Sequence, residues 1–381
     1  RQTNIVKPLD WPRYPYPFIY GQVDHRLFPI AEWRECSRQA LGTKWLDSWT
    51  ADSHGNDDPM LVEQIRTRLL PRRGIMARED EVLVTMGAQH ALYLIASLLV
   101  SRGTQVGLED PGYPDVRNIF GLRTNKVQPI QVDASGLITD DRLVGCDLIY
   151  TTPSHQAPTT VTMPEARRQE LLEAAQRHRI LVIEDDYEFE TNYVRASSPA
   201  LKSIDRSSRV IYVGSLSKTL FPGLRLGYLV ADRAFIAEAR ALRRLMVRHP
   251  PSNNQRTAAL FLALGHHDAL VMRLRRAYSE RWRVMSEALR TIAPELDYVK
   301  SAGGTSYWVR GPASLDARVL AEQARQEGLL LEPGDIYFSE QPSPQNFFRL
   351  GFSSIDVSQI EPGIRLLTKL FSHQHAQTGN A

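Results

Sequence analysis

The sequence predicts an α/β fold: a large domain with a mostly parallel sheet flanked by helices, and a smaller α+β domain. Two observations predict it. Short apolar runs rich in β-branched residues alternate with amphipathic runs of helical spacing over the first two thirds of the chain. After about Arg248 this alternating pattern is replaced by a long Arg-rich helical run and shorter strand-like runs. Strands that are apolar throughout are typical of a parallel sheet that helices cover on both faces.

The first region supplies the elements of the large sheet. Apolar periodicity predicts helices over 60–70, 88–101, 164–178 and 235–248. In the first of these, Leu61, Val62, Ile65 and Leu69 fall on one face. We expect strands over 82–85, 105–108, 147–151, 180–183, 209–213 and 224–230.

The second region predicts a smaller unit. A helix is expected over 268–289, followed by strands over 306–309, 329–331 and 347–350 and helices over 315–326 and 357–371. We therefore expect a large domain over 51–284 and a small domain made of 1–50 and 285–381.

Composition excludes several classes of protein. The 381 residues carry 46 Lys and Arg against 43 Asp and Glu, so the chain is no polycation built for nucleic acid. Its two cysteines, Cys36 and Cys146, belong to no CxxC motif, and we expect no disulfide scaffold and no metal. The apolar stretch 91–100 is too short to cross a membrane. We expect a cytoplasmic protein, and the start at Arg1 in a Pro-rich run suggests one domain of a longer protein.

Segment 209–230, RVIYVGSLSKTLFPGLRLGYLV, is the most informative. A strand leads into a turn that ends at Lys218. A desolvated lysine near other cations has a lowered pKa and attacks carbonyl groups to form a Schiff base. The hydroxyls of Ser215 and Ser217, with Arg225 beyond them, can hold an anion such as phosphate. A surface lysine in a polar turn is the plainer interpretation of this motif alone.

Acidic residues end the strand in ILVIEDDYE. In α/β sheets this edge is where ligands sit. Asp185 is the candidate for pairing with a cation or a protonated ring nitrogen, and Tyr187 for donating a hydrogen bond nearby. A metal site or a solvated acidic loop is the alternative.

Two turns complete the pattern. In VLVTMGAQHAL a strand passes through a glycine into a helix, whose free backbone amides at Ala88 and Gln89 suit a phosphate. In EDPGYP a Pro-Gly turn presents Tyr113, which can stack on a flat ligand. An ordinary turn and a core tyrosine are the plainer interpretations.

Together these motifs resemble the fold-type-I pyridoxal-phosphate enzymes of the aspartate aminotransferase superfamily. Three segments, TPSHQAPTTVTM, IEDDYEFE and SLSKTLFPGLRLGYLV, look like the aminotransferase-like domain of MocR/GabR-type bacterial transcription regulators. The resemblance runs from about Ile19 to about Lys369.

The resemblance implies a cofactor, pyridoxal 5'-phosphate, held by Lys218 as an internal aldimine. Asp185 would pair with the ring nitrogen, and Tyr187 would bond the phenolic oxygen with His155 or Gln156 close by. Tyr113 would stack on the ring. The phosphate would lie among Ala88, Gln89, Ser215, Ser217 and Arg225. Arg349, in FFRLGFS, would bind the carboxylate of an amino-acid ligand.

Two departures from the family pattern stand out. Pro158-Thr159-Thr160 replaces the usual Pro-Thr-Gly or Pro-Ser-Gly. The loop before Met60 lacks the tyrosine that often reaches the neighbouring subunit's phosphate; His54 lies in that loop. We still expect a homodimer.

The resemblance favours an effector-sensing domain that forms an aldimine with an amine or amino acid and meets DNA only through a region outside this chain. A stand-alone aminotransferase is the alternative. Ten arginines between Arg240 and Arg283 are interpreted as solvated helix faces and ion pairs rather than a DNA surface.

Overall fold

The large sheet has eight strands. A computed structural model of the chain describes residues 5, 7–194 and 198–378. The strand order is β2 (Val82–Thr85), β9 (Gly227–Val230), β8 (Val210–Ser215), β7 (Leu181–Asp185), β6 (Leu148–Thr151), β3 (Val106–Asp110), β4 (Val127–Asp133) and β5 (Gly136–Leu137). From β8 to β4 neighbouring strands are parallel, whereas β9 runs antiparallel to both β2 and β8. The predicted mostly parallel sheet is confirmed.

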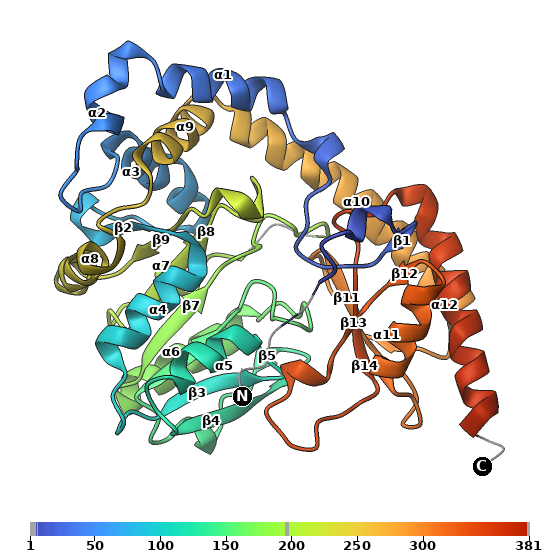
Figure 1. Ribbon diagram of the computed structural model, residues 1–381. Helices are drawn as coiled ribbons and strands as arrows, with labels where there is room; N and C mark the ends of the chain where they lie inside the picture. The colour runs from blue at the N-terminus through green and yellow to red at the C-terminus, as the bar shows by residue number, and fades with distance from the viewer. Residues whose placement is uncertain (1–4, 6, 195–197, 379–381) are drawn as a thin grey trace.

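Helices cover both faces of this sheet (Figure 1). One layer holds α4 (Gly87–Leu99), α5 (Pro114–Gly121) and α8 (Arg233–Val247). The other holds α3 (Pro59–Gln64), α6 (Glu165–His178), α7 (Leu201–Ile204) and α9 (Ser252–Ala263). In β8, Ile211 and Val213 face the first layer while Val210 and Tyr212 face the second. Successive side chains of a strand point to opposite faces, so a sheet between two layers must be apolar throughout.

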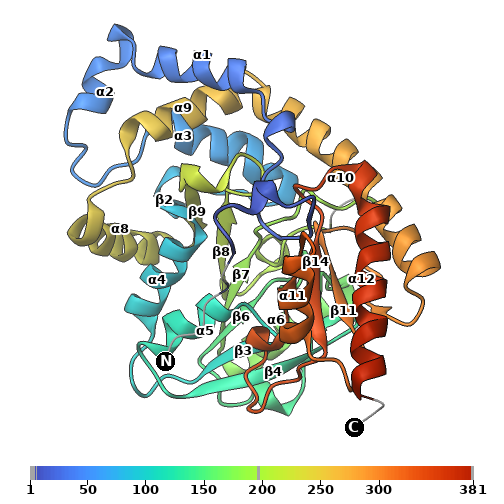
Figure 2. The ribbon, with the colours of Figure 1, turned by 45° about the vertical axis from the view of Figure 1, so that its right-hand side comes forward.

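The second sheet is small and antiparallel. It consists of β10 (Asp297–Tyr298), β11 (Ser306–Arg310), β14 (Phe347–Gly351) and β13 (Glu332–Pro333). Helices α11 (Ala317–Gln326) and α12 (Val357–Thr378) lie beside it, and α10 (His266–Ile292) runs from the large sheet's side of the molecule to α12 (Figure 2).

The N-terminal segment contacts both parts. Strand β1 (Tyr16–Pro17) pairs in parallel with β12 (Leu329–Leu330). Helix α1 (Ile30–Ala40) and helix α2 (Leu46–Thr50) instead pack against α9. The division into 51–284 and 1–50 with 285–381 stays a prediction.

Several helices and strands differ from the sequence-based prediction or were not predicted. The predicted helix 60–70 is α-helical only to Gln64 and continues as a π-helical turn over Ile65–Leu69. The 3-10 turn after it contains Pro71, which has no N–H to continue the hydrogen-bond ladder. Strand β4 was missed because only Ile130 in it is fully buried, so it lacks a continuous apolar run. Helices α1, α5 and α9 were also not predicted.

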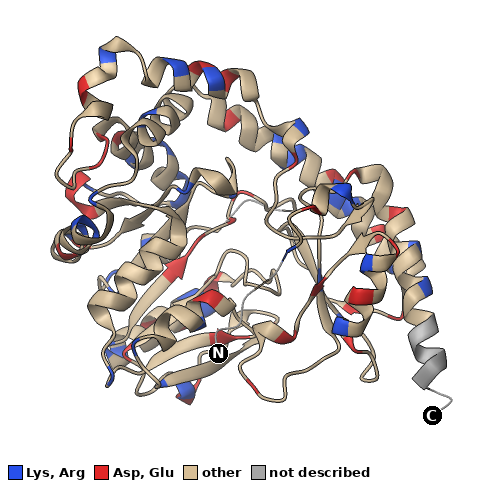
Figure 3. Cartoon of the chain, viewed as in Figure 1, with Lys and Arg blue, Asp and Glu red and all other residues tan. Residues whose placement is uncertain are grey.

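Charges of both signs are interspersed over the helices (Figure 3). Five of the ten arginines between Arg240 and Arg283 form ion pairs inside the chain: Arg240, Arg243, Arg248, Arg256 and Arg281. This pairing agrees with the expected ion pairs, but Arg243, Arg256 and Arg281 are buried and do not belong to a solvated face. Within the described residues, no helix combines the length and the apolar character needed to cross a membrane.

Candidate cofactor and ligand site

Polar residues at the ends of the large sheet's strands meet the small sheet around a cavity of about 310 Å³. The crevice outside the carboxyl ends of the strands is where open α/β sheets bind ligands. The structure brings ten of the twelve predicted site residues to this cavity: Ala88, Gln89, Tyr113, Asp185, Tyr187, Ser215, Ser217, Lys218, Arg225 and Arg349.

His155 and Gln156 do not line the cavity. The Gln156 side-chain amide donates to Glu109, to the Pro111 carbonyl and to the Ala157 carbonyl. The ring of His155 is buried, and burial lowers its pKa to about 4. Because the Gln156 amide is committed to Glu109 and to backbone carbonyls, it supports the loop after β6.

Lys218 follows β8 and lies at the centre of the site. Its Nζ is 4.2 Å from the centroid of the Tyr20 ring. Burial, more than any other influence, lowers its pKa to about 8, and Lys7 and Arg349 act in the same direction while Glu188 opposes them. A larger share of this lysine is therefore neutral near pH 7 than of a solvated one, which makes it a better nucleophile.

Asp185 ends β7 and faces the cavity. Its Oδ2 accepts a hydrogen bond of 2.8 Å from the Tyr150 hydroxyl, and its Oδ1 is buried without a partner. Burial raises the pKa of Asp185 to about 7, with the charges of Asp186 and Glu109 adding to the effect. An unpartnered buried carboxylate oxygen is costly and calls for a donor that a ligand would supply.

Groups whose chemistry suits an anion lie where α4 begins. The backbone amides of Ala88 and Gln89 are at its N-terminus and line the same cavity as Ser217, whose hydroxyl is buried without a partner. The Arg225 guanidinium packs over Gly87, where a Cβ atom would be only 2.9 Å from Nη2. Gly87 has φ of +80°, so glycine is needed there both for the turn and for the close approach. Amides at a helix N-terminus and a guanidinium together suit a phosphate.

Arg349 lines the cavity from β14 of the small sheet and is 3 % exposed. It donates a 3.2 Å hydrogen bond to the Tyr337 hydroxyl and lies 3.8 Å from the centroid of the Tyr20 ring. Its nearest carboxylate oxygen, on Glu332, is also 3.8 Å away, and its own Nε has no partner. The guanidinium is thus held by aromatic rings and keeps a free donor for an anion.

Sequence reasoning missed several residues of this cavity: Lys7, Tyr20, Gly21, Asp115, Tyr150 and Tyr337. Tyr150 could have been recognised from the sequence, since it is the next-to-last residue of the predicted strand 147–151 and of β6. Lys7 and Tyr20 come from the Pro-rich N-terminal segment, which shows no pattern linking it to the site. Asp115 accepts hydrogen bonds from both Gln89 and Tyr113 and so links two predicted residues.

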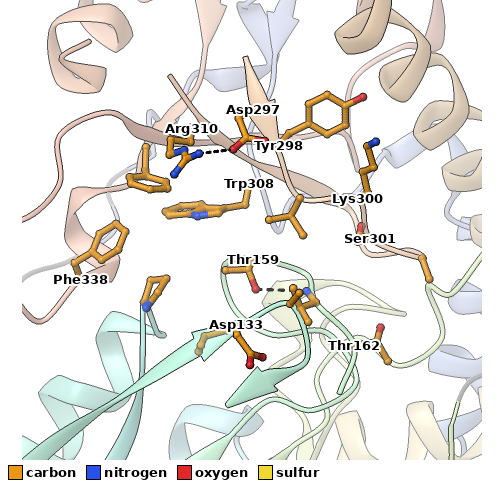
Figure 4. A pocket seen from close by; sticks show the side chains of 17 residues that line it. Asp133, Thr159, Thr162, Asp297, Tyr298, Lys300, Ser301, Trp308, Arg310 and Phe338 are labelled. Carbon is orange, nitrogen blue, oxygen red and sulfur yellow. Dashed lines mark hydrogen bonds and ion pairs between the residues drawn. The ribbon is translucent and has the colours of Figure 1, made fainter. Parts of the chain in front are cut away.

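A second hollow of about 700 Å³ lies between the small sheet and the ends of β4 and the 152–163 loop (Figure 4). Trp308 and Phe338 face Thr159 across it. The Arg310 side chain there is already paired with Asp297 at 2.8 Å. None of the described residues lining it has a buried, unpartnered polar atom, in contrast to the first cavity.

Comparison with known proteins decides the family. The family model for class I and II aminotransferases matches residues 58–367. The chain belongs to the class I and II aminotransferase family. This membership confirms the predicted fold type and the predicted cofactor, pyridoxal 5'-phosphate.

Relatives refine this placement of the aminotransferase-family chain. It is 46 % identical to the HTH-type transcriptional regulator TauR of Rhodobacter capsulatus, over 93 % of this chain and 74 % of the relative. It is 31 % identical to the probable rhizopine catabolism regulatory protein MocR of Rhizobium meliloti, over 93 % and 72 %. These relatives confirm the predicted resemblance to the aminotransferase-like domain of MocR-type regulators.

A solved aminotransferase has the same fold. The α-aminoadipate aminotransferase LysN of Thermus thermophilus, complexed with N-(5'-phosphopyridoxyl)-L-leucine, superposes with a TM-score of 0.86 at 27 % identity and covers 97 % of this chain and 95 % of its own.

The threonine that stands in place of the family's usual glycine, Thr160, has an unusual backbone conformation. Thr160 has φ of +64°, a region that favours glycine and is uncommon for a β-branched residue.

Proposed function

We propose that this aminotransferase-family chain binds pyridoxal 5'-phosphate through Lys218 and senses an amine or amino acid whose nitrogen replaces that of Lys218. One observation carries the proposal: a buried lysine of lowered pKa, a buried carboxylate with a free oxygen and a separate anion-binding group surround one cavity. The bound cofactor supplies an aldehyde carbon for an amine and a ring that withdraws electrons.

The residues present fit this cofactor. The free Oδ1 of Asp185 would accept from the protonated ring nitrogen, and Tyr113 would lie against the ring. Tyr187 would donate to the phenolic oxygen. The amides of Ala88 and Gln89, the hydroxyls of Ser215 and Ser217 and the Arg225 guanidinium would hold the phosphate. Gln156 would act on the cofactor only through the loop it supports, and His155 does not line the cavity.

Arg349 is the proposed anchor for the carboxylate of an amino-acid ligand. Its unpartnered Nε supports this role, as does its place in the small sheet, whereas Arg225 lines the same cavity from the large sheet. Two anion sites, one for the phosphate and one for the carboxylate, would place the ligand's amine between them, where Lys218 lies. Such a fork of donors fits a carboxylate in a way that an ammonium does not.

Two functions use this geometry. The regulators TauR and MocR among the relatives favour a sensor, in which ligand binding biases a two-state conformation. The class I and II family model and the fold shared with LysN support the second candidate, a stand-alone aminotransferase. An aminotransferase must in addition move a proton from the ligand carbon and turn over.

The cofactor assignment is tested by borohydride reduction of the protein loaded with pyridoxal phosphate, followed by peptide mapping. Two lysines, Lys7 and Lys218, line the cavity, so the map discriminates between them. We expect the stable adduct on Lys218, its loss in Lys218→Ala and its retention in the matched control Lys7→Ala. An adduct on Lys7, or none, would overturn the assignment.

The choice between sensor and enzyme is tested by adding an amino acid with and without a keto acid. For a sensor, the cofactor spectrum shifts and stays shifted, and no new keto acid accumulates. Sustained turnover of roughly 1 per second or more with any pair establishes the aminotransferase instead.

A further inference from the structure

Lys218 borders two spaces. Besides the cavity of the candidate site, it lines a small chamber of about 20 Å³ together with Gly21, Glu188, Tyr278 and Thr305. A chamber of that size has room for one water molecule or a small polar group. Gly21 makes the space available, because a Cβ atom there would lie 3.0 Å from the Lys218 Nζ. The amine therefore stands at the boundary between the proposed cofactor cavity and a small polar chamber.

Glu188 is the acidic group of this chamber. It is 3 % exposed. Its Oε1 accepts a 2.5 Å hydrogen bond from the Thr305 hydroxyl, whereas its Oε2 is buried with no partner. Burial raises the pKa of Glu188, and the charge of Lys218 opposes that effect more than any other group does. Nothing in the proposed binding of cofactor or ligand uses this carboxylate.

We propose that Glu188 and its chamber receive the Lys218 ammonium when a ligand amine takes the place of Lys218 on the cofactor. Glu188 is then a positioning residue that acts through Lys218. The inference rests on the proposed function and adds to it a second, defined position for the lysine.

The exchange balances without an outside proton donor. The ligand would enter as an ammonium, and its nitrogen would form the double bond to the cofactor's aldehyde carbon that the Lys218 nitrogen gives up. The ligand nitrogen would give up two protons and the Lys218 nitrogen would take up two, since each nitrogen keeps one hydrogen while it is bound to that carbon. Lys218 would then leave as an ammonium and meet the Glu188 carboxylate. An ammonium paired in this way has no lone pair to accept the ligand's Cα proton. Glu188 thereby favours a persistent ligand complex over turnover.

The charge of Lys218 is set by groups from several elements. Glu188 and Glu332 stabilise its ammonium, while Lys7 and Arg349 destabilise it. The charge of Lys218 also acts on Asp185, whose pKa it lowers. The Tyr20 ring lies against the Lys218 amine, and Tyr278 lines the same chamber. Among these groups, Glu188 makes the largest contribution that favours the ammonium.

The test measures the pKa of Lys218 in the cofactor-free protein. Only the neutral amine captures pyridoxal phosphate, so the capture rate against pH has a midpoint that reports this pKa. Glu188→Gln removes the negative charge and should move the midpoint lower by about 1 pH unit. Thr305→Val keeps the carboxylate but removes its hydrogen-bond donor, and should move the midpoint in the same direction by less. The matched control is Glu190→Gln, two residues along the same turn, whose carboxyl does not line the chamber.

The outcomes separate the inference from the function on which it rests. Capture on Lys218 with a midpoint lowered in Glu188→Gln and Thr305→Val, and unchanged in Glu190→Gln, supports the proposal. Capture on Lys218 with the same midpoint in all four proteins overturns it and leaves the cofactor assignment intact. No capture on Lys218 in the unaltered protein overturns the proposed function itself. Thr305→Val provides the answer if Glu188→Gln does not fold, which far-ultraviolet circular dichroism would reveal.

Discussion

Asp185 and Asp186 are neighbours in the chain but serve opposite sides of the large sheet. Asp185 faces the cavity, where Tyr150 donates to it at 2.8 Å. Asp186 is buried on the other side, where it accepts hydrogen bonds of 2.5 Å from Arg73 and from Ser154. Alternation along an extended strand produces this separation. The Arg73–Asp186 ion pair thus anchors the end of β7 and leaves Asp185 free to meet a ligand.

Because the two carboxylates have different partners, replacing each by asparagine should have different effects. Asp185→Asn should weaken pyridoxal phosphate binding, because it removes the charge that keeps the ring nitrogen protonated, and should leave the fold intact. Asp186→Asn should instead destabilise the protein by about 3–5 kcal/mol, since the buried Arg73 guanidinium loses its counter-charge. Cofactor titration and urea unfolding check the two effects. A stable Asp186→Asn protein with lost cofactor affinity would reverse the assignment.

The raised pKa of Asp185 makes stability depend on pH in the cofactor-free protein. Burial raises this pKa from 3.8 to about 7, so the folded protein keeps a proton that the unfolded chain releases. The free energy of unfolding therefore falls as the pH rises from about 4 to about 7, because the unfolded chain releases the Asp185 proton more readily than the folded protein does. We expect Asp185→Asn to stabilise the cofactor-free protein at pH 8, on the order of a few kcal/mol, and to change it little at pH 4. Unfolding in urea at both pH values measures this, and an equal effect at both would contradict it.

Gly87 is predicted to control affinity for the phosphate. A methyl group there would press on the Arg225 guanidinium and strain a backbone with φ of +80°. Gly87→Ala should weaken pyridoxal phosphate binding about tenfold or more, as loss of a charged hydrogen bond would. It should leave binding of pyridoxal, which has no phosphate, nearly unchanged. Gly121→Ala is the control, because nothing lies within 4 Å of a Cβ atom there.

Arg349 is predicted to select for a carboxylate. L-Alanine and ethylamine differ by that group alone, so the pair isolates the contribution of Arg349. Arg349→Lys should weaken the L-alanine-induced change in the cofactor spectrum about 10- to 100-fold, because an ammonium cannot bind in a bidentate way. The response to ethylamine should stay the same. Arg310→Lys, on the exposed end of the same sheet, serves as the control, and equal losses for both probes would contradict the role.

We predict a homodimer. Exposed apolar side chains gather at the C-terminal end of α8, where Leu245 is 76 % exposed. Others lie at the end of α1 and the start of α2, at Leu41 and Leu46. Apolar groups of this kind mark an interaction surface when they form a patch. Sedimentation at micromolar concentration should show a dimer that Leu245→Glu weakens and that Met76→Glu, on an exposed residue elsewhere, does not. A monomer would contradict the prediction.

Much of the site was predictable because its residues follow strands in the chain. Asp185, Ser215, Lys218 and the Gly87 turn all lie where a predicted strand ends, and parallel strands bring their carboxyl ends to one edge. Arg349 was placed by family resemblance alone. Lys7, Tyr20 and Glu188 were not predicted. Lys7 and Tyr20 reach the site from the distant N-terminal segment, and Glu188 contacts only the small chamber beside Lys218, so no local pattern marks them.

The sequence by itself determined the α/β class and the order of most strands and helices, since these depend on local periodicity, and the family resemblance of its motifs implied the cofactor. Only the tertiary structure decided that Tyr20 lies against both Lys218 and Arg349, that Gln156 supports the loop around Glu109, and that Glu188 shares a chamber with Lys218. The physical reason is that burial and charge pairing depend on which distant segments pack together, and it is packing, not sequence spacing, that desolvates Lys218 and leaves the Asp185 and Glu188 oxygens without partners.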